Sequence, residues 1–243
     1  MNIQLCIPHN YQVFNKQFVI SLLGVVNSFY AYNAQNDNKH KLSTVVMGGW
    51  KIDSIRNGLV VQALNGETTH LMWLDTDMTF KPSVIGDMIE LFEKDEKLDA
   101  VTGLYTWKKP PFKPHVYTSY NKEKGNFIPA AGFPLDEPFE VKGAGYGCLM
   151  IKIEVYNKVW RPWFEMKIEN GHIVYGEDLF FFKKAQPIKM LCDPRILCSH
   201  LTEINIDITS YIDYNKLKVE YNTIILTDEQ INEVGNEHKN KNS

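Results

Sequence analysis

The stretch HLMWLDTDMTF, residues 70–80, decides the fold assignment of this chain. It begins as an apolar run of the length of a buried strand and ends in two carboxylates, Asp75 and Asp77. If the strand continued through them, both aspartates would point to the same side, because side chains two residues apart in a strand share a face. Like charges held that close repel each other, and a divalent cation between them removes the repulsion. A solvated loop that caps the next helix is the alternative.

The segments around this stretch alternate between strand and helix patterns. Apolar runs bounded by turn residues predict four strands, at residues 2–7, 41–49, 69–75 and 99–107. Apolar side chains at helical spacing predict three helices, at residues 15–34, 52–66 and 81–97. We expect Pro8 to end the first strand and Asp53 or Ser54 to cap the second helix. This alternation predicts a mostly parallel sheet with helices on both faces.

The second half of the chain has a looser pattern. Residues 108–140 are rich in proline, glycine and charge, which predicts loops with a short hairpin. Order resumes in FEVKGAGYGCLMIKIEVYNKV (139–159; two strands and a helix), GEDLFFFKKAQ (176–186; a helix) and IKMLCDPRILCSHLT (188–202; a pair of strands). The chain has no repeat and no clear linker, which favours one α/β domain over residues 1–215. Residues 216–243 would be a C-terminal extension whose polar end we expect to be disordered.

The composition is that of an ordinary globular protein. The 243 residues are 44% apolar and 23% charged, and the net charge of -3 lacks the basic excess of nucleic-acid-binding proteins. The N-terminus has no signal-peptide pattern, and its longest apolar run, FVISLLGVV (residues 18–26), is too short to span a bilayer. The four cysteines lack CxxC spacing. We therefore expect a soluble protein with buried thiols in the reducing cytoplasm, without disulfides or a zinc site.

The two aspartates lie at the end of the third expected strand, at the edge where such folds carry their chemistry. Open parallel sheets bind ligands beyond the carboxyl ends of their strands. Mg²⁺ and Mn²⁺ prefer carboxylate oxygens together with substrate phosphates. A site built from Asp75 and Asp77 alone is incomplete. A metal here therefore implies a phosphorylated substrate that supplies further ligands.

Two other polar features are ambiguous when taken singly. Glu177 and Asp178 open an expected helix, where acidic side chains also complement the positive end of the helix dipole. His200 lies at the end of a late strand, and a lone histidine is more often a surface or core residue than a metal ligand. Neither feature identifies a site by itself.

In combination, five segments of the chain resemble the GT-A class of glycosyltransferases. They are THLMWLDTDM (69–78), VTGLYTWKKPPFKPHVYT (101–118), VKGAGYGCLMIKIEVYNKV (141–159), YGEDLFFFKKA (175–185) and CSH (198–200). Small family-2-like enzymes of viruses and phages are the most similar members, and the resemblance spans roughly residues 3–201. It implies a single GT-A, Rossmann-like domain that moves a sugar from a nucleotide-diphosphate donor, a UDP-sugar, to a hydroxyl of a glycan or glycoprotein. For a viral enzyme it implies the host cytoplasm.

The resemblance also implies roles for the acidic residues and the late histidine. Asp77 would bind Mn²⁺ or Mg²⁺ directly, Asp75 would lie nearer the ribose or bind through water, and His200 would complete the metal site. Asp178 would be the catalytic base, with Glu177 as its neighbour. A base there predicts inversion at the anomeric carbon, although retaining members also carry acidic pairs here. Because a helix N-terminus stabilises a carboxylate, we expect Asp178 to be a weak base.

For the nucleotide, the resemblance points to two other parts of the chain. The segment IPHN (residues 7–10) would lie against the base, through Pro8 and His9. Arg56, in the second helix, would reach a phosphate or the base, and a plain surface arginine is the alternative. The segment KGAGYG (residues 142–147) would lie along the cleft for sugar and acceptor.

Four more side chains have both a binding and a structural interpretation. Trp50 and Trp107 can stack on the base or sugar, or they can pack in the core. Lys108 and Lys109 precede two prolines in an expected mobile loop. There they can clamp the diphosphate when substrate binds, or remain solvated.

Two other classes of protein compete with a glycosyltransferase. A sugar-1-phosphate nucleotidyltransferase uses a related fold but carries a phosphate loop rich in glycine and arginine after its first strand. Here that position reads IPHNYQVFNK (residues 7–16), and no glycine precedes Gly24. A sugar-binding module that has lost catalysis is the other alternative. The presence of the acidic residues and the late histidine argues against such a module.

Overall fold

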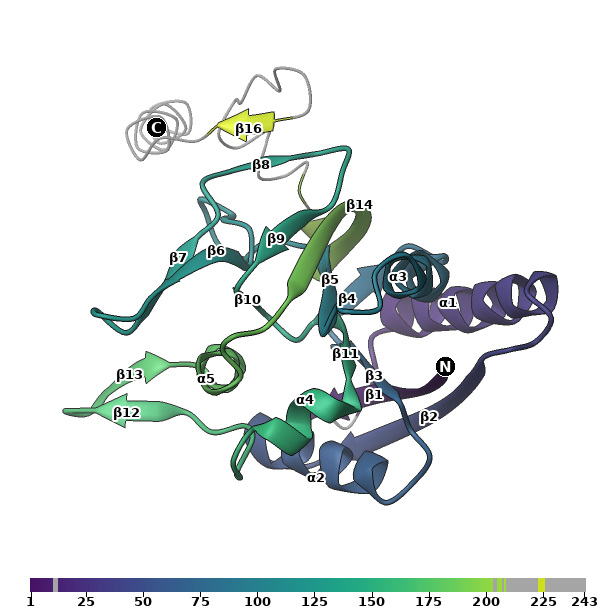
Figure 1. Ribbon diagram of the computed structural model, residues 1–243, viewed down its shortest axis with the longest axis horizontal. Helices are drawn as coiled ribbons and strands as arrows, with labels where there is room; N and C mark the ends of the chain where they lie inside the picture. The colour runs from purple at the N-terminus through teal and green to yellow at the C-terminus, as the bar shows by residue number, and fades with distance from the viewer. Residues whose placement is uncertain (11–12, 203–204, 207, 209–222, 226–243) are drawn as a thin grey trace.

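The computed structural model describes residues 1–10, 13–202, 205–206, 208 and 223–225. A central sheet carries helices on both faces (Figure 1). The helices are α1 (Lys16–Gln35), α2 (Ile52–Leu64), α3 (Val84–Lys94), α4 (Ile153–Lys158) and α5 (Glu177–Lys184). In spatial order, the sheet contains β15 (Asn205–Ile206), β14 (Met190–Leu201), β5 (Ala100–Leu104), β11 (Cys148–Lys152), β3 (His70–Leu74), β1 (Asn2–His9) and β2 (Lys41–Gly48).

Most strands of this sheet run in the same direction. β1 pairs in parallel with both β2 and β3, and β14 pairs in parallel with β5. β11 lies between β3 and β5 and is antiparallel to both, so β3 and β5 share a direction. The expected fold class, one Rossmann-like α/β domain with a mostly parallel central sheet flanked by helices, is confirmed.

Alternating side chains divide the core into two layers. On β1, Leu5 and Ile7 pack on the side of α1 and α3, whereas Cys6 packs on the side of α2. β3 and β5 are buried along their whole length, as expected of central strands covered on both faces. The edge strand β2 has only half-buried and exposed positions instead. The centre of the sheet is therefore the firmly packed part, and the aspartates follow one of its strands.

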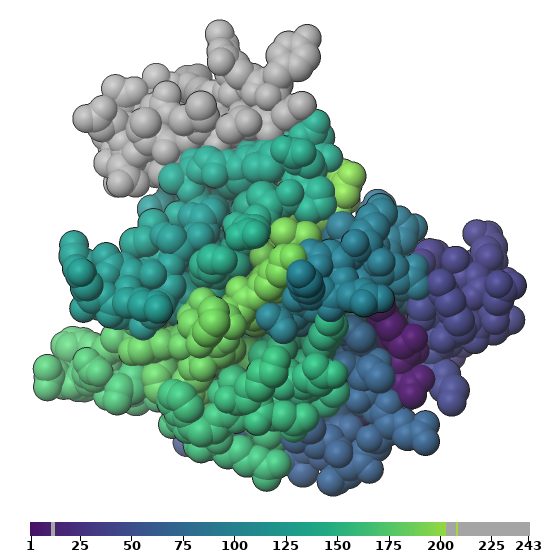
Figure 2. Space-filling model, in the orientation of Figure 1, coloured from purple at the N-terminus to yellow at the C-terminus, as the bar shows by residue number. Residues whose placement is uncertain are grey.

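Shorter strands extend the fold beyond the sheet. β4 (Met78–Phe80) and β9 (Phe139–Val141) pair with β14, away from the main strand order. A three-stranded sheet contains β10 (Gly143–Ala144), β6 (Val116–Asn121) and β7 (Asn126–Pro129), and β8 (Gly132–Pro134) pairs with β16 (Thr223–Ile225). The hairpin of β12 (Lys167–Glu169) and β13 (His172–Tyr175) projects from the body of the molecule, as its surface shows (Figure 2).

The expected elements of the first half are found, with corrections at several of their ends. The strand expected at residues 99–107 spans Ala100–Leu104, and the helix expected at residues 81–97 spans Val84–Lys94. β1 does not end before Pro8, because this residue continues the parallel register with β2. α2 begins at Ile52 with Lys51 in the cap position, so neither Asp53 nor Ser54 is the cap. Asp53 instead complements the helix dipole from within the first turn.

In the second half the structure adds elements that the sequence pattern did not reveal. The late segment is one long strand, β14, whose register shifts between Asp193 and Leu197, so the expected strand pair is wrong. The first part of β14 pairs with β5 and β9, and its last part pairs with β4. The expected hairpin in residues 108–140 is present as β6 and β7.

Three other expectations concern the whole chain. The four cysteines are buried free thiols, as predicted. Within the described part of the chain, no helix is both long enough and apolar enough to cross a bilayer. The predicted domain boundary between residues 215 and 216 lies outside the described residues.

Candidate active site

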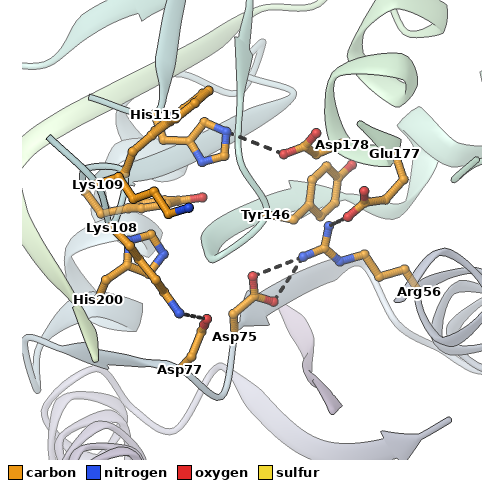
Figure 3. A pocket seen from close by; sticks show the side chains of 12 residues that line it. Arg56, Asp75, Asp77, Lys108, Lys109, His115, Tyr146, Glu177, Asp178 and His200 are labelled. Carbon is orange, nitrogen blue, oxygen red and sulfur yellow. Dashed lines mark hydrogen bonds and ion pairs between the residues drawn. The ribbon is translucent and has the colours of Figure 1, made fainter. Parts of the chain in front are cut away.

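A cavity of about 400 Å³ opens where β3 and β5 end (Figure 3). This is the carboxyl edge of the parallel strands, the edge at which open α/β sheets bind ligands. The lining is charged and aromatic, and consists of Arg56, Asp75, Asp77, Tyr105, Trp107, Lys108, Lys109, His115, Tyr146, Glu177, Asp178 and His200. It includes six of the eight site residues expected from the sequence, all except Pro8 and His9.

Asp75 and Asp77 belong to a turn between β3 and β4. β3 ends at Leu74, so the expectation that the two aspartates share one face of a continuing strand is wrong. Both side chains nevertheless line the cavity, while Thr76 between them is buried. The backbone N–H of Asp75 donates to the carbonyl of Gly147 (3.1 Å), and that of Leu201 donates to the carbonyl of Asp77 (2.6 Å). β14 therefore fixes the position of Asp77.

The same strand brings His200 to the aspartate turn. His200 pairs with Met78 of β4 in the antiparallel ladder, directly after the turn. Its Nδ1 contacts the carbonyl oxygen of Thr106. Burial lowers the pKa of His200, against the opposing effect of Asp77. In the neutral ring Nδ1–H donates to this carbonyl, so Nε2 keeps its lone pair.

Arg56 is a buried cation that links two parts of the site. Its side chain, 4% exposed, comes from α2. It donates to both carboxylate oxygens of Asp75 (3.1 Å each) and to Oε1 of Glu177 (2.7 Å), and it lies 5.2 Å from the ring centroid of Tyr146. Burial disfavours the charged guanidinium, yet the pKa of Arg56 is raised, because the carboxylates outweigh desolvation. Arg56 thus ties the end of β3 to the start of α5.

Glu177 and Asp178 occupy the first turn of α5 and have different surroundings. The Glu177 carboxylate accepts from Arg56, whereas Oδ1 of Asp178 accepts from the backbone N–H of Leu179 (2.7 Å). Burial raises the pKa of Asp178, although Arg56 acts in the opposite direction. The expectation that Asp178 is a weak base is therefore wrong, because desolvation outweighs the helix N-terminus.

His115 also lines the cavity, although the sequence pattern did not single it out. It lies directly before β6, and its Nε2 is 3.6 Å from Oδ2 of Asp178. Burial lowers the pKa of His115 to about 4, helped by the nearby His200. Its signal in the sequence was weak, a single histidine at the end of a proline-rich loop.

The loop after β5 brings basic and aromatic side chains to the cavity. The ammonium of Lys108 forms an ion pair with Asp77, and Lys109 also lines the cavity. Trp107 lines it with 52% of its surface exposed, and Trp50 lies elsewhere, fully exposed. Core packing is therefore wrong as an interpretation of either tryptophan.

Pro8 and His9 lie beside the cavity without lining it. They end β1, which neighbours β3 in the sheet. The ring of His9 packs 5.1 Å from that of Phe14. Both residues therefore share the carboxyl edge with the aspartate turn.

The three expected metal ligands do not form a complete site. No group of three histidine, cysteine, aspartate or glutamate side chains within the described residues is placed to hold a metal ion. Asp75 fits less well, because the Arg56 guanidinium that donates to both of its oxygens already neutralises its charge and would repel a metal ion. Asp77 and His200 do fit, since Asp77 already binds a cation, the Lys108 ammonium, and His200 retains a lone pair on Nε2. These two ligands would need a phosphorylated partner to complete the coordination.

Comparisons with known proteins give matches among solved structures. No protein-family model matches the chain, and no curated protein matches it. The crystal structure of A197 from STIV aligns with a TM-score of 0.56 and 19% sequence identity, covering 94% of this chain and 95% of that chain. The structure of GalNAc-T7 with UDP, GalNAc and Mn²⁺ aligns with a TM-score of 0.49 and 10% identity, covering 88% of this chain and 48% of that chain. The similarity to A197 shows a shared fold, and the similarity to GalNAc-T7 is too weak to carry an argument.

Proposed function

We propose that this chain is a metal-dependent glycosyltransferase of the GT-A class that moves a sugar from a UDP-sugar to a hydroxyl acceptor with inversion. The observation that carries the proposal is a cavity with two distinct acidic centres. Asp77 lies with His200 and Lys108 on one side, and Asp178 lies with His115 on the other (Figure 3). A transferase needs both a cationic site for a leaving diphosphate and a base for an acceptor.

On the first side, the chain can bind the diphosphate of the donor. Mn²⁺ or Mg²⁺ held by Asp77 and His200 would supply a Lewis acid that neutralises the departing charge. Lys108 and Lys109 add positive charge to the same region of the cavity. We assign Asp75 to the ribose instead, because a carboxylate that accepts from Arg56 still has lone pairs for hydroxyl groups.

On the second side, Asp178 can accept the proton of the acceptor hydroxyl. The acceptor oxygen then bonds to the anomeric carbon while the bond from that carbon to the diphosphate oxygen breaks, and the nucleoside diphosphate leaves with the electron pair. A buried carboxylate with a raised pKa suits a general base better than a solvated one. Glu177 suits this role less, because its carboxylate is held by Arg56 at 2.7 Å.

The rest of the donor would extend along the carboxyl edge of the sheet. The cavity volume, about 400 Å³, lies within the range of small-molecule sites. Pro8 and His9 are adjacent to it on β1 and are our candidates for contact with the base. Trp107 offers an exposed ring to the sugar or base. The acceptor we expect is a glycan or glycoprotein hydroxyl.

The proposal is tested by the release of nucleoside diphosphate from a panel of nucleotide sugars, with Mn²⁺ or with EDTA. We expect release from a UDP-sugar that requires the metal and is lost in Asp178→Asn. Asp136→Asn, which makes the same change at an exposed position, should behave like the parent. No release from any donor would contradict the proposal. Pyrophosphate formed from a sugar phosphate and a nucleoside triphosphate would identify a nucleotidyltransferase instead.

A further inference from the structure

Residues 108–115, which comprise the loop after β5 and the histidine that follows it, contact both acidic centres of the cavity. At its start, Lys108 forms the ion pair with Asp77. Directly after its end, the imidazole of His115 approaches Asp178 (Figure 3). One short segment thus contacts the side of the cavity assigned to the diphosphate and the side assigned to the base.

The backbone of His115 is fixed on two sides. Its N–H donates to the carbonyl of Tyr105 (2.9 Å), and its carbonyl accepts from the N–H of Gly145 (3.1 Å). Gly145 also makes room for the ring, because a Cβ there would lie 2.0 Å from Tyr105 Oη and 2.5 Å from His115 Nδ1. Residue 145 must therefore be glycine, because the side chains of Tyr105 and His115 occupy the space that a Cβ would need.

Aromatic side chains hold the imidazole ring itself. Tyr105, Trp107 and Tyr117 meet it edge to face, with centroid distances of 5.5, 5.7 and 6.1 Å. The side chain of His115 is 22% exposed, so it borders the cavity while most of it is packed. This packing points Nε2, rather than Nδ1, at Asp178.

We propose that His115 is a positioning residue that holds the Asp178 carboxylate toward the acceptor hydroxyl. This inference rests on the proposed function. A neutral imidazole carries one N–H, and the tautomer with hydrogen on Nε2 presents a donor to the carboxylate. The 3.6 Å separation from Oδ2 needs only a small side-chain adjustment to reach hydrogen-bond distance. Leu179 N–H holds the other oxygen, so two donors from different elements would fix the carboxylate plane.

The test compares two substitutions of the same residue. His115→Phe keeps a ring for the aromatic packing and removes the donor, whereas His115→Gln keeps an N–H near the position of Nε2. We expect His115→Phe to lower kcat by ~10–100-fold, the usual effect of losing an orienting partner, with donor KM within about twofold of the parent. His115→Gln should recover most of kcat. His172→Phe, at an exposed position on β13, is the matched control and should leave kcat unchanged.

Three results would overturn the inference. They are a full kcat in His115→Phe, an equal loss in the Phe and Gln variants, and a loss that falls on donor KM alone. A melting temperature measured for each variant separates these results from misfolding.

A second measurement needs no turnover. Nitrogen chemical shifts of the His115 ring in the full-length protein should show hydrogen on Nε2, and they should change in Asp178→Asn. A parent that releases no nucleotide would contradict the proposed function. His115 ring shifts that are unchanged in Asp178→Asn, or that show hydrogen on Nδ1, would overturn the proposed contact between the two side chains. This result does not depend on which reaction the protein catalyses.

Discussion

Replacing Arg56 with methionine tests the ion pairs in the wall of the cavity. Methionine fills much of the same volume but leaves two carboxylates without their cation, Asp75 (27% exposed) and Glu177 (13% exposed). Removing one partner of a buried ion pair costs ~3–5 kcal/mol of folding free energy. Because both carboxylates keep some contact with solvent, we expect the lower value, about 3 kcal/mol at pH 7. For a chain of this length that lowers the melting temperature by about 6–12 °C.

The pH dependence of this loss has a definite sign. Burial raises the pKa of Asp75 in the folded protein, and Arg56 opposes that rise. A carboxyl whose pKa is higher in the folded protein than in the unfolded chain binds more protons when folded. The free energy of unfolding therefore falls as the pH rises from the unfolded pKa through the folded pKa. Without Arg56 the folded pKa moves higher still. The stability gap between parent and variant should therefore be smaller at pH 5 than at pH 7.

Urea unfolding followed by circular dichroism at both pH values measures this gap. Arg161→Met is the matched control, because it removes an exposed guanidinium that stacks on Trp163. We expect the control to cost less than about 1 kcal/mol at either pH. An Arg56 variant within about 1 kcal/mol of the parent at pH 7, or a gap that grows on acidification, would refute this reasoning.

Three further variants address the acids and the loop. Asp178→Asn should lower kcat by the ~10²–10⁴-fold typical of a lost general base, with donor affinity nearly unchanged. Glu177→Gln should cost less than about tenfold, because its amide oxygen can still accept from the buried guanidinium. The reverse order of effects, measured by initial rates, would exchange the two roles. Lys108→Ala with Lys109→Ala should weaken UDP binding about tenfold in calorimetry, from ~1.5 kcal/mol of lost charged contacts. The control Lys122→Ala, on an exposed turn, should leave UDP binding unchanged.

The sequence pattern predicted the fold well where single elements carry their own signal. β3 and β5 are central strands, and their continuous apolar runs reflect burial on both faces. The length of β14 was not predictable in this way, because Pro194 interrupts the pattern while the strand changes partners from β5 to β4. β4 itself is three residues long, too short to show a period.

The site was predictable where its residues belong to motifs of a known family, and unpredictable where a contact depends only on packing. The resemblance to GT-A glycosyltransferases implied that Asp77, His200 and the acids of α5 belong to one site, and all of them line the cavity. The expected position of Asp75 and Asp77 on one face of a strand was wrong, because both residues lie in the turn between β3 and β4. The partners of Arg56 lie 19 and 121 residues away, so only the folded chain reveals that it binds carboxylates. His115 was missed for the same reason, since its contact with Asp178 is not local.

The binding of UDP in the presence and absence of Mn²⁺ tests the central claim most directly. Calorimetry on the parent should show UDP binding that weakens at least about tenfold when EDTA replaces Mn²⁺, a change of about 1.4 kcal/mol. Asp77→Asn should show the weaker affinity under both conditions. UDP affinity that is equal with Mn²⁺ and with EDTA, or equal in parent and variant, would contradict a metal-dependent donor site at Asp77.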